Sequence, residues 1–324
     1  MNRKCPFVFH ALEVLETNTV YVYDRTISSG TYGWVVLCKG YSRVRNPNRA
    51  GSSGYSLKPI GKTFALKIVD ANKILSDPVA SRRFNNECEI TGHINHPGVI
   101  RSFTQMATSL ESTEKPGTQH DVLILVMEFF EGPELLALIK DGPLGRGLSR
   151  DGAPETERAA RIIFRRICRA VAHLHSKFII HRDIKAENVL VDDDFNIKIV
   201  DLGYGKKFTP GVRHTSPLGT LFYASPEVLD TKNGYVGPEV DAWSLGVLLY
   251  CMLFRTFPFY AEKADREIDE VAVASKIRRD RLRFPTGFCV SSEAIDMISS
   301  LLDRNPGNRL LPADAVNHPW LKRY

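Results

Sequence analysis

The stretch from His181 to Gly203 constrains this chain more than any other part of its sequence. It begins His181-Arg182-Asp183-Ile184-Lys185-Ala186-Glu187-Asn188 and ends Asp201-Leu202-Gly203. Between these polar groups lie two short apolar runs, 189–191 and 197–200, which flank an acidic turn as the strands of a β-hairpin would. Such a hairpin would fix the distance between Asn188 and Asp201. Both side chains offer the hard oxygen atoms that magnesium prefers.

These residues resemble the catalytic loop and metal-binding motif of eukaryotic protein kinases, His-Arg-Asp-x-x-x-x-Asn followed by Asp-Phe-Gly, with Leu202 in place of phenylalanine. Phosphoryl transfer depends mainly on positioning and charge neutralisation. The resemblance implies that Asp183 orients the substrate hydroxyl and accepts its proton, while Asn188 and Asp201 hold two Mg2+ ions. Lys185 together with Thr220 is typical of serine/threonine kinases and not of tyrosine kinases.

Alternating apolar and polar residues from Thr19 to Lys39 predict two antiparallel strands around a glycine turn. This turn is similar to the kinase Gly-x-Gly-x-x-Gly-x-Val loop, with Ser28 in place of the first glycine. An ordinary glycine-rich hairpin explains the turn equally well on its own. By resemblance, the loop residues that contact ATP are Ile27, Ser28, Ser29, Gly30, Thr31, Gly33 and Val35.

A second apolar strand, Phe64–Val69, fits the kinase Val-Ala-Ile-Lys strand. Lys67 on this strand needs a charged partner, because an unpaired buried ammonium costs several kcal/mol. The resemblance names Glu87 of helix αC as that partner. Most kinases have a large apolar residue at the position of Thr91, so we expect a helix that is held less firmly.

Residues 122–130 predict a buried strand that leads into a hinge between two lobes. By resemblance, Met127 is the gatekeeper, and the backbones of Glu128 and Phe130 pair with the adenine edge. The other residues assigned to the ATP site are Ala65, Glu134, Glu187 and Leu190. Glu134 and Glu187 also suggest a preference for arginine upstream of the acceptor, although Glu134 is explained as well by its place at a helix N-terminus.

The C-terminal half predicts helices around an activation segment that spans 206–227. Pro154 opens a long helix whose buried stripe is Ile163, Ile167, Ala170 and Leu174. The resemblance implies that Arg182 docks a phosphate placed on Ser216 or Thr215 by an upstream activating kinase. It also implies that Asp241 holds the backbone of the catalytic loop and that Arg309 pairs with Glu227.

Length, charge and cysteine content indicate which other classes of protein this chain could belong to. The chain has 324 residues, 43% of them hydrophobic, which is enough for two lobes with separate cores. Its formal net charge is +6, with Lys and Arg spread along the chain, so no nucleic-acid partner is expected. Six cysteines without Cys-x-x-Cys spacing indicate free thiols and an intracellular, cytoplasmic or nuclear protein. The longest apolar run, 245–254, is far short of the roughly 20 residues that span a bilayer, so no membrane partner is expected.

The predicted fold is α+β and bilobal, with a five-stranded antiparallel sheet and helix αC in a small lobe and a mainly helical large lobe. Residues 1–20 are expected to form an N-terminal extension, and 21–321 a kinase domain with its lobes at about 21–127 and 133–321 and its hinge at about 128–132. The connecting segments 40–61 and 107–119 are expected to be irregular insertions.

The implied function is a monomeric serine/threonine protein kinase that uses ATP and Mg2+ and acts on protein substrates. It resembles the calmodulin-dependent and AMP-activated kinase group, with some Aurora-like features. Three alternatives stand beside it: a weakly active pseudokinase scaffold, a kinase of small molecules or lipids, and a regulatory binding module.

Overall fold

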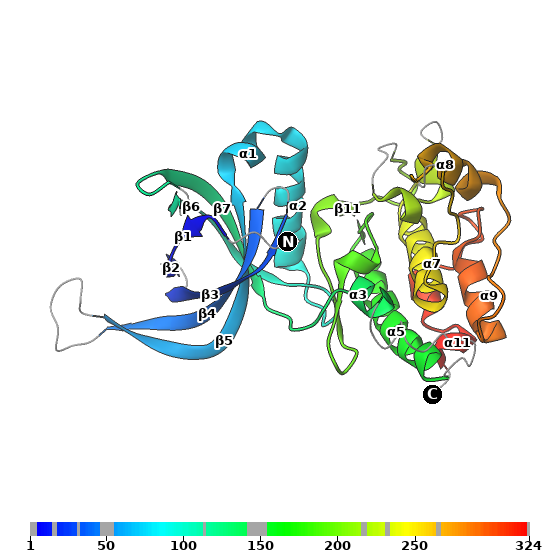
Figure 1. The fold of residues 1–324 in the computed structure, drawn as a ribbon, viewed down its shortest axis with the longest axis horizontal. Coiled ribbons are helices and arrows are strands. Elements are labelled where there is room, and N and C mark those ends of the chain that lie inside the picture. Colours follow the sequence, from blue (N-terminus) through cyan, green and yellow to red (C-terminus); the bar gives the residue numbers. More distant parts are fainter. Residues whose placement is uncertain are drawn as a thin grey trace. The chain divides into compact units, whose positions relative to one another are not determined.

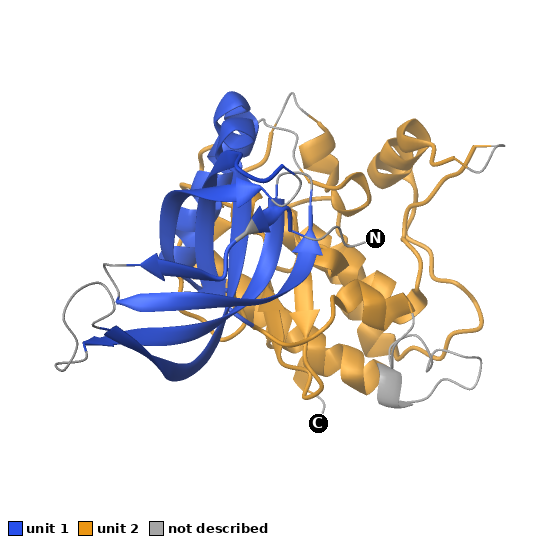
Figure 2. Ribbon diagram, turned by 60° about the vertical axis from the view of Figure 1, so that its left-hand side comes forward, with its two compact units in different colours: residues 1–93, 100–129 blue, residues 94–99, 130–324 orange. Residues whose placement is uncertain are grey.

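The computed structural model describes residues 5–14, 18–30, 33–45, 55–112, 115–140, 154–214, 219–230, 234–263 and 267–322. The chain divides into two compact units (Figure 2). The first contains residues 1–93 and 100–129, and the second contains residues 94–99 and 130–324. One unit is an antiparallel sheet with helices and the other is mainly helical, so the predicted α+β class is confirmed.

The sheet of the first unit has seven antiparallel strands in the order β1-β6-β7-β5-β4-β3-β2 (Figure 1). They are β1 Phe7–Val8, β2 Ala11–Val14, β3 Thr19–Ser29, β4 Gly33–Arg45, β5 Tyr55–Asp70, β6 Ser102–Ser112 and β7 Gln119–Glu128. The expected sheet had five strands, and the additional β1 and β2 come from the segment expected to be an extension. Only Phe9 and His10 join β1 to β2, yet these strands stand at opposite ends of the strand order. The sheet therefore curls on itself.

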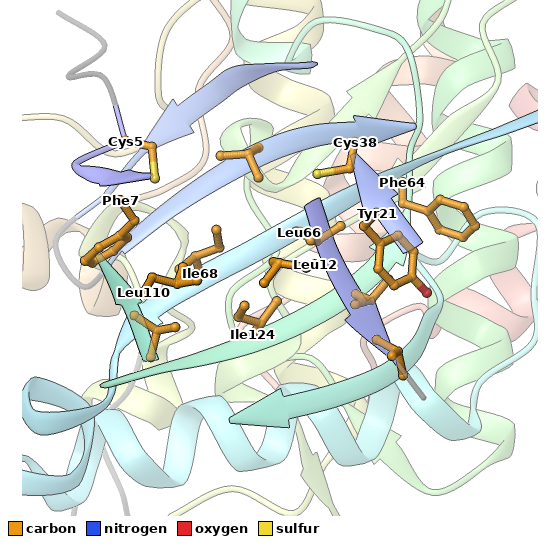
Figure 3. Close-up of a cluster of buried hydrophobic side chains, with 14 residues drawn as sticks. Cys5, Phe7, Leu12, Tyr21, Cys38, Phe64, Leu66, Ile68, Leu110 and Ile124 are labelled. Atoms are coloured by element: carbon orange, nitrogen blue, oxygen red, sulfur yellow. The ribbon is translucent and has the colours of Figure 1, made fainter. Parts of the chain in front are cut away.

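The added strands cover an apolar interior. β2 buries alternate residues, Leu12 and Val14, as the period of a half-buried strand requires. The core that forms there combines residues from several strands (Figure 3). Its buried members are Cys5, Phe7, Leu12, Val14, Tyr21, Val36, Cys38, Phe64, Leu66, Ile68, Leu110, Val122, Ile124 and Val126.

The expectation of irregular insertions at 40–61 and 107–119 was wrong for the described residues. β4 continues to Arg45 and β5 already begins at Tyr55, with these two residues paired across the ladder. β6 likewise continues to Ser112, and β7 begins at Gln119. Along 107–112 the strand buries alternate residues, Leu110 and Ser112, whereas 55–62 is exposed throughout and is joined to β4 by ladder hydrogen bonds alone.

Two helices, α1 Ala71–Ser76 and α2 Pro78–His93, follow β5. Pro78 occupies the first turn of α2, where its missing N–H costs nothing. The Asp77 carboxylate accepts hydrogen bonds from the amides of Val79 and Ala80, which caps this helix. The buried face of α2 includes Phe84, Glu87, Ile90 and Thr91.

The second unit is built on two long helices. α5 (Pro154–Ser176) buries the predicted stripe completely, and α7 (Pro238–Phe254) is buried from Val240 onward. Its other helices are α3 Leu135–Lys140, α6 Pro226–Leu229, α8 Glu270–Arg279, α9 Ser292–Leu301, α10 Pro312–Ala315 and α11 Pro319–Lys322. Its short strands are β8 Ile179–Ile180, β9 Val189–Val191, β10 Ile197–Ile199 and β11 Lys206–Lys207.

Candidate active site

The loop between β8 and β9 carries most of the predicted catalytic residues. It ends in a single 3-10 turn, Ala186–Asn188, from which β9 continues directly. β9 and β10 pair antiparallel as predicted, with Val189 opposite Ile199. The amide of Val200 donates to the carbonyl of Asn188 at 3.0 Å. The hairpin therefore places Asp201 next to Asn188, as the sequence pattern predicted.

Asp183 lies at the centre of a polar cluster. Its carboxylate is 3% exposed and accepts from Lys185 Nζ at 2.8 Å, from Asn188 Nδ2 at 3.1 Å and from Thr220 Oγ1 at 3.2 Å. Lys185 Nζ also donates to Thr220 Oγ1 at 3.2 Å. These contacts fix the orientation of the carboxylate, and the ammonium compensates for its desolvation.

Asn188 is oriented by the same cluster. Besides its bond to the Asp183 side chain, its amide nitrogen donates to the Asp183 carbonyl at 2.8 Å. The amide oxygen is therefore the atom through which Asn188 could hold a cation. One carboxylate and one amide suit Mg2+ that is also bound to nucleotide phosphates. Among the described residues, no group of three or more His, Cys, Asp and Glu side chains is arranged to hold a metal without such help.

Asp241, a fully buried residue on α7, holds the backbone of this loop. The sequence resemblance assigned this role to it. Its carboxylate accepts from the amides of His181 and Arg182 and from His175 Nε2, each at 2.8 Å. Burial by itself raises the pKa of Asp241, but the hydrogen bond and charge of His175 and the loop amides outweigh it, so that the pKa is lowered. Asp241 is therefore ionised and anchors the loop.

Backbone strain marks two residues at this site. Arg182 and Asp201 have φ values of 66° and 57°, in the left-handed region that non-glycine residues rarely adopt. Asp201 accepts a hydrogen bond from the Gly203 amide at 3.4 Å. Such strain costs about 1–3 kcal/mol per residue and accumulates where function requires a fixed geometry.

Arg182 links the catalytic loop to the segments that follow it. Its Nε donates to the Tyr204 carbonyl at 2.7 Å and its Nη1 to the Tyr235 hydroxyl at 3.2 Å. The predicted phosphorylation positions Ser216 and Thr215 lie outside the described residues. Gly219, just beyond them, has φ +99°, and a Cβ there would lie 2.8 Å from the Arg182 carbonyl.

The first unit contains the second group of predicted residues. Lys67 on β5 donates to Glu87 on α2, and the Glu87 side chain is only 5% exposed. Val35 is the cross-strand partner of Lys67, and Ala65 lies two residues along the same strand. Side chains on a strand alternate between faces, so Val35, Ala65 and Lys67 share one face of the sheet.

The glycine turn lies between β3 and β4. Gly30 donates to the Gly33 carbonyl at 2.8 Å, and a Cβ on Gly33 would lie 2.0 Å from the Ile68 carbonyl. Gly33 is thus required by close backbone packing, whatever its role toward a nucleotide. Ile27, Ser28 and Ser29 end β3, whereas Thr31 lies outside the described residues.

The expected hinge residues divide between the units. Glu128 ends β7, and its amide and carboxylate bond to the backbone of Arg101. Phe130 begins the next part of the second unit, where Glu134 forms an isolated β-bridge with Leu190. Glu187 has a buried carboxylate oxygen, Oε2, without a hydrogen-bond partner among the described residues.

Several contacts at the site were not predicted from the sequence. They are the Arg182–Tyr235 hydrogen bond, the His175–Asp241 hydrogen bond and the approach of Gly219 to Arg182. Gly219, next to Thr220, is the only one of these that the sequence could have indicated, because glycine often occurs where φ is positive. The Arg182–Tyr235 and His175–Asp241 hydrogen bonds join residues far apart in the chain, and no sequence pattern predicts them.

Comparison with known proteins identifies the family of this chain. The family model described as "Protein kinase domain" matches residues 50–321, a range that begins after the glycine turn. Serine/threonine-protein kinase cds1 of Schizosaccharomyces pombe is 30% identical over 312 residues, which cover 94% of this chain and 58% of that protein. Serine/threonine-protein kinase RAD53 of Saccharomyces cerevisiae is 33% identical over 276 residues, which cover 81% of this chain and 30% of that protein.

A mammalian relative extends the comparison. NUAK family SNF1-like kinase 2 of Rattus norvegicus is 32% identical over 301 residues, which cover 93% of this chain and 40% of that protein. The chain spans 30–58% of the length of these three relatives. In the part of the chain that the structure describes, no helix is both long and apolar enough to cross a bilayer.

Proposed function

The chain belongs to the protein kinase family, and from this premise we propose that it transfers the γ-phosphoryl group of ATP to serine or threonine side chains of proteins. The observation that carries the proposal is the cluster around Asp183, in which Lys185, Asn188 and Thr220 hold one buried carboxylate. We assign the activity to residues 21–321, with the hinge at 128–132.

Each residue of the cluster has a proposed task. Asp183 orients the incoming hydroxyl and accepts its proton, because its carboxylate is held in one position by three neighbours. Lys185 neutralises charge beside it. Asn188 and Asp201 would hold Mg2+, which when bound neutralises the phosphate charge that develops during transfer.

The first unit supplies the proposed ATP contacts. Lys67 binds the phosphates, and its pair with Glu87 positions the ammonium. The backbone amides near Gly30 and Gly33 approach the phosphates, while Val35 and Ala65 contact the adenine from the shared face of the sheet. The other proposed ATP contacts are Phe130, Glu134, Glu187 and Leu190.

A transfer assay with ATP, Mg2+ and a generic serine peptide tests the reaction. We expect Asp183→Asn to lower kcat by about 100-fold to 10,000-fold, the range of general base catalysis, when measured at a temperature at which circular dichroism shows the variant to be folded. A pseudokinase scaffold would instead give no transfer with the unaltered chain. A small-molecule or lipid kinase would leave the peptide unmodified and phosphorylate a hydroxylated metabolite or lipid.

The proposed substrate preference is an arginine upstream of the acceptor. Its support is Glu187, whose buried Oε2 has no partner among the described residues and would be compensated by a guanidinium. Replacing the upstream arginine of a peptide by alanine should lower kcat/KM about tenfold for the unaltered chain and by much less for Glu187→Gln. Equal discrimination by both proteins would contradict the assignment.

Activation by phosphorylation at Ser216 or Thr215, through an upstream kinase, is also proposed. Arg182, whose guanidinium already contacts two segments of this unit, supplies the charge that would bind the phosphate. Full activity from the Thr215→Ala/Ser216→Ala variant would contradict it. We further propose that the chain acts inside the cell as a monomer.

A further inference from the structure

The ends of β4 and β5 form a two-stranded ribbon, residues 41–45 and 55–62, that we call the arm (Figure 1). β3 accompanies β4 only as far as Ser42, and β7 accompanies β5 only from Phe64. Every residue from Tyr55 to Lys62 is exposed. Isolated two-stranded ribbons are marginally stable in water, so a long exposed one calls for an explanation.

The arm lies within a basic stretch of the sequence and carries four of its cations, Arg43, Arg45, Lys58 and Lys62. The segment 39–62 has six Lys and Arg residues and no Asp or Glu, which equals the net charge of +6. Outside it, the remaining 37 of the 43 basic residues are matched by the 37 acidic ones. Basic residues thus occur along the whole sequence, and six of them lie in a stretch that has no acidic residue.

Part of this charge is uncompensated in the folded chain. Lys39 pairs with Asp24, and Arg43 pairs with Glu13. Arg45, Lys58 and Lys62 have no ion-pair partner among the described residues. The arm therefore presents three unpaired cations to solvent, where they attract acidic groups.

Apolar side chains lie among these cations. Tyr55 and Leu57 are 45% and 48% exposed, and Val44 on β4 is 42% exposed. The Arg43 guanidinium lies 3.8 Å from the centre of the Tyr55 ring, which fixes both side chains in place. Tyrosine and arginine next to aliphatic residues are the composition of protein-binding surfaces.

The arm also has an open backbone edge. Residues 55–59 pair with β4 along one edge, residues 60–62 lie in a register shift of that ladder, and no described strand pairs with the other edge. From Tyr55 to Lys58 this edge can accept an added strand, which recognises a polypeptide backbone and not a phosphate backbone. Pro59, which has no amide hydrogen, and Gly61, with φ +69°, end the extended edge. A second copy of this chain would bring its own cations to the same place and be repelled.

We infer that the arm is a docking surface for an acidic, extended segment of another protein, which adds a strand to the open edge of β5. Its carboxylates pair with Lys58 and Lys62, and its apolar residues contact Tyr55 and Leu57 on the other face of the strand. Arg45, on β4, adds attraction at longer range within the screening length. The inference does not depend on the proposed transfer reaction, because binding is measured without ATP.

The test is fluorescence anisotropy with the full chain and a short labelled peptide in which glutamate alternates with valine. We expect saturable binding that weakens with added salt, because exposed charge pairs are screened. The variant Arg45→Glu/Lys58→Glu/Lys62→Glu should bind the peptide at least about tenfold more weakly. A factor of ten in affinity corresponds to roughly 1.4 kcal/mol, and the three lost charge attractions, each worth a fraction of that, together reach it. No saturable binding of the peptide would overturn the inference.

A matched control separates local contacts from net charge. Lys73, Arg82 and Lys115 are exposed cations elsewhere in the same unit. Reversing all three to glutamate changes the net charge equally and should leave peptide affinity within about twofold. Equal losses for both triple variants would overturn the inference, as they would show that only overall charge matters.

Three further probes test the nature of the partner. A peptide of the same sequence with alternate backbone amides methylated cannot add a strand and should bind at least fivefold more weakly. Equal binding would contradict strand addition. Tighter binding of a single-stranded oligonucleotide or of phosphatidylserine vesicles, lost in the arm variant, would replace the protein partner by a nucleic acid or a membrane.

Discussion

At the residue scale, the site depends on groups that cannot be exchanged for close analogues. Gly219 is one, because its φ of +99° and the proximity of the Arg182 carbonyl leave no room for a side chain. Asp241 is another, because its two carboxylate oxygens accept three hydrogen bonds in a fully buried position. Neither would touch substrate, yet each positions residues that would.

Gly219→Ala should lower kcat by a factor on the order of 10 to 100, because displacing Arg182 misplaces Thr220 and Asp183. Gly211→Ala is the matched control, since Gly211 also has a positive φ but a Cβ added there would meet no atom within 4 Å. The measurement is kcat with a serine peptide for both variants. Similar losses in both would show that backbone strain alone is responsible.

Asp241→Asn should lower the free energy of unfolding at pH 7 by about 3 kcal/mol, as for other broken buried charge contacts. The pKa of Asp241 is lowered in the folded chain. Its stabilising effect is therefore complete above the unfolded pKa of about 4 and is lost as pH falls through the folded value. The difference between the variant and the unaltered chain should thus shrink below about pH 4 in urea titrations.

The exposed Asp193 provides the control for this experiment. Asp193→Asn should change the free energy of unfolding by less than about 0.5 kcal/mol, as is usual for surface substitutions. A difference for Asp241→Asn that stays constant from pH 7 to pH 3 would contradict the assigned direction of the pKa shift.

At the scale of elements, a buried polar contact joins α2 to β6. Thr91 Oγ1 donates to the Glu87 carbonyl at 2.6 Å and lies 2.8 Å from Ser102 Oγ. Both residues are buried. The sequence led us to expect a helix held less firmly at Thr91; the structure adds a hydrogen bond where most kinases have an apolar contact.

Thr91→Val should lower the free energy of unfolding by about 1–3 kcal/mol, because it leaves the buried Ser102 hydroxyl without this partner. The double variant Thr91→Val/Ser102→Ala should lose about 1 kcal/mol less free energy of unfolding than the sum of the losses in the two single variants. Urea unfolding of the four proteins measures this coupling. Strict additivity would show that the two hydroxyls do not interact.

At the scale of the whole molecule, the chain consists of two compact units. In the first unit, the strands before Thr19 complete the sheet and supply buried residues such as Phe7 and Leu12. Unit 1 thus depends on residues that precede the expected domain.

Leu12→Ala should lower the free energy of unfolding by about 2–5 kcal/mol, as for other core leucines. Leu75→Ala removes the same atoms from a side chain that is 68% exposed and should have little effect. Denaturant midpoints of the two variants make the comparison. Equal, small effects would show that β2 is not part of the stable core.

The sequence alone determined the local parts of this protein: the β9–β10 hairpin and the buried stripe of α5. Each of these depends on spacing within a few dozen residues, which periodicity and motifs record. Tertiary structure alone decided that β1 pairs with β6 and that His175 contacts Asp241. Those contacts join distant segments, and their stability comes from burial and ladder hydrogen bonds that no local pattern encodes.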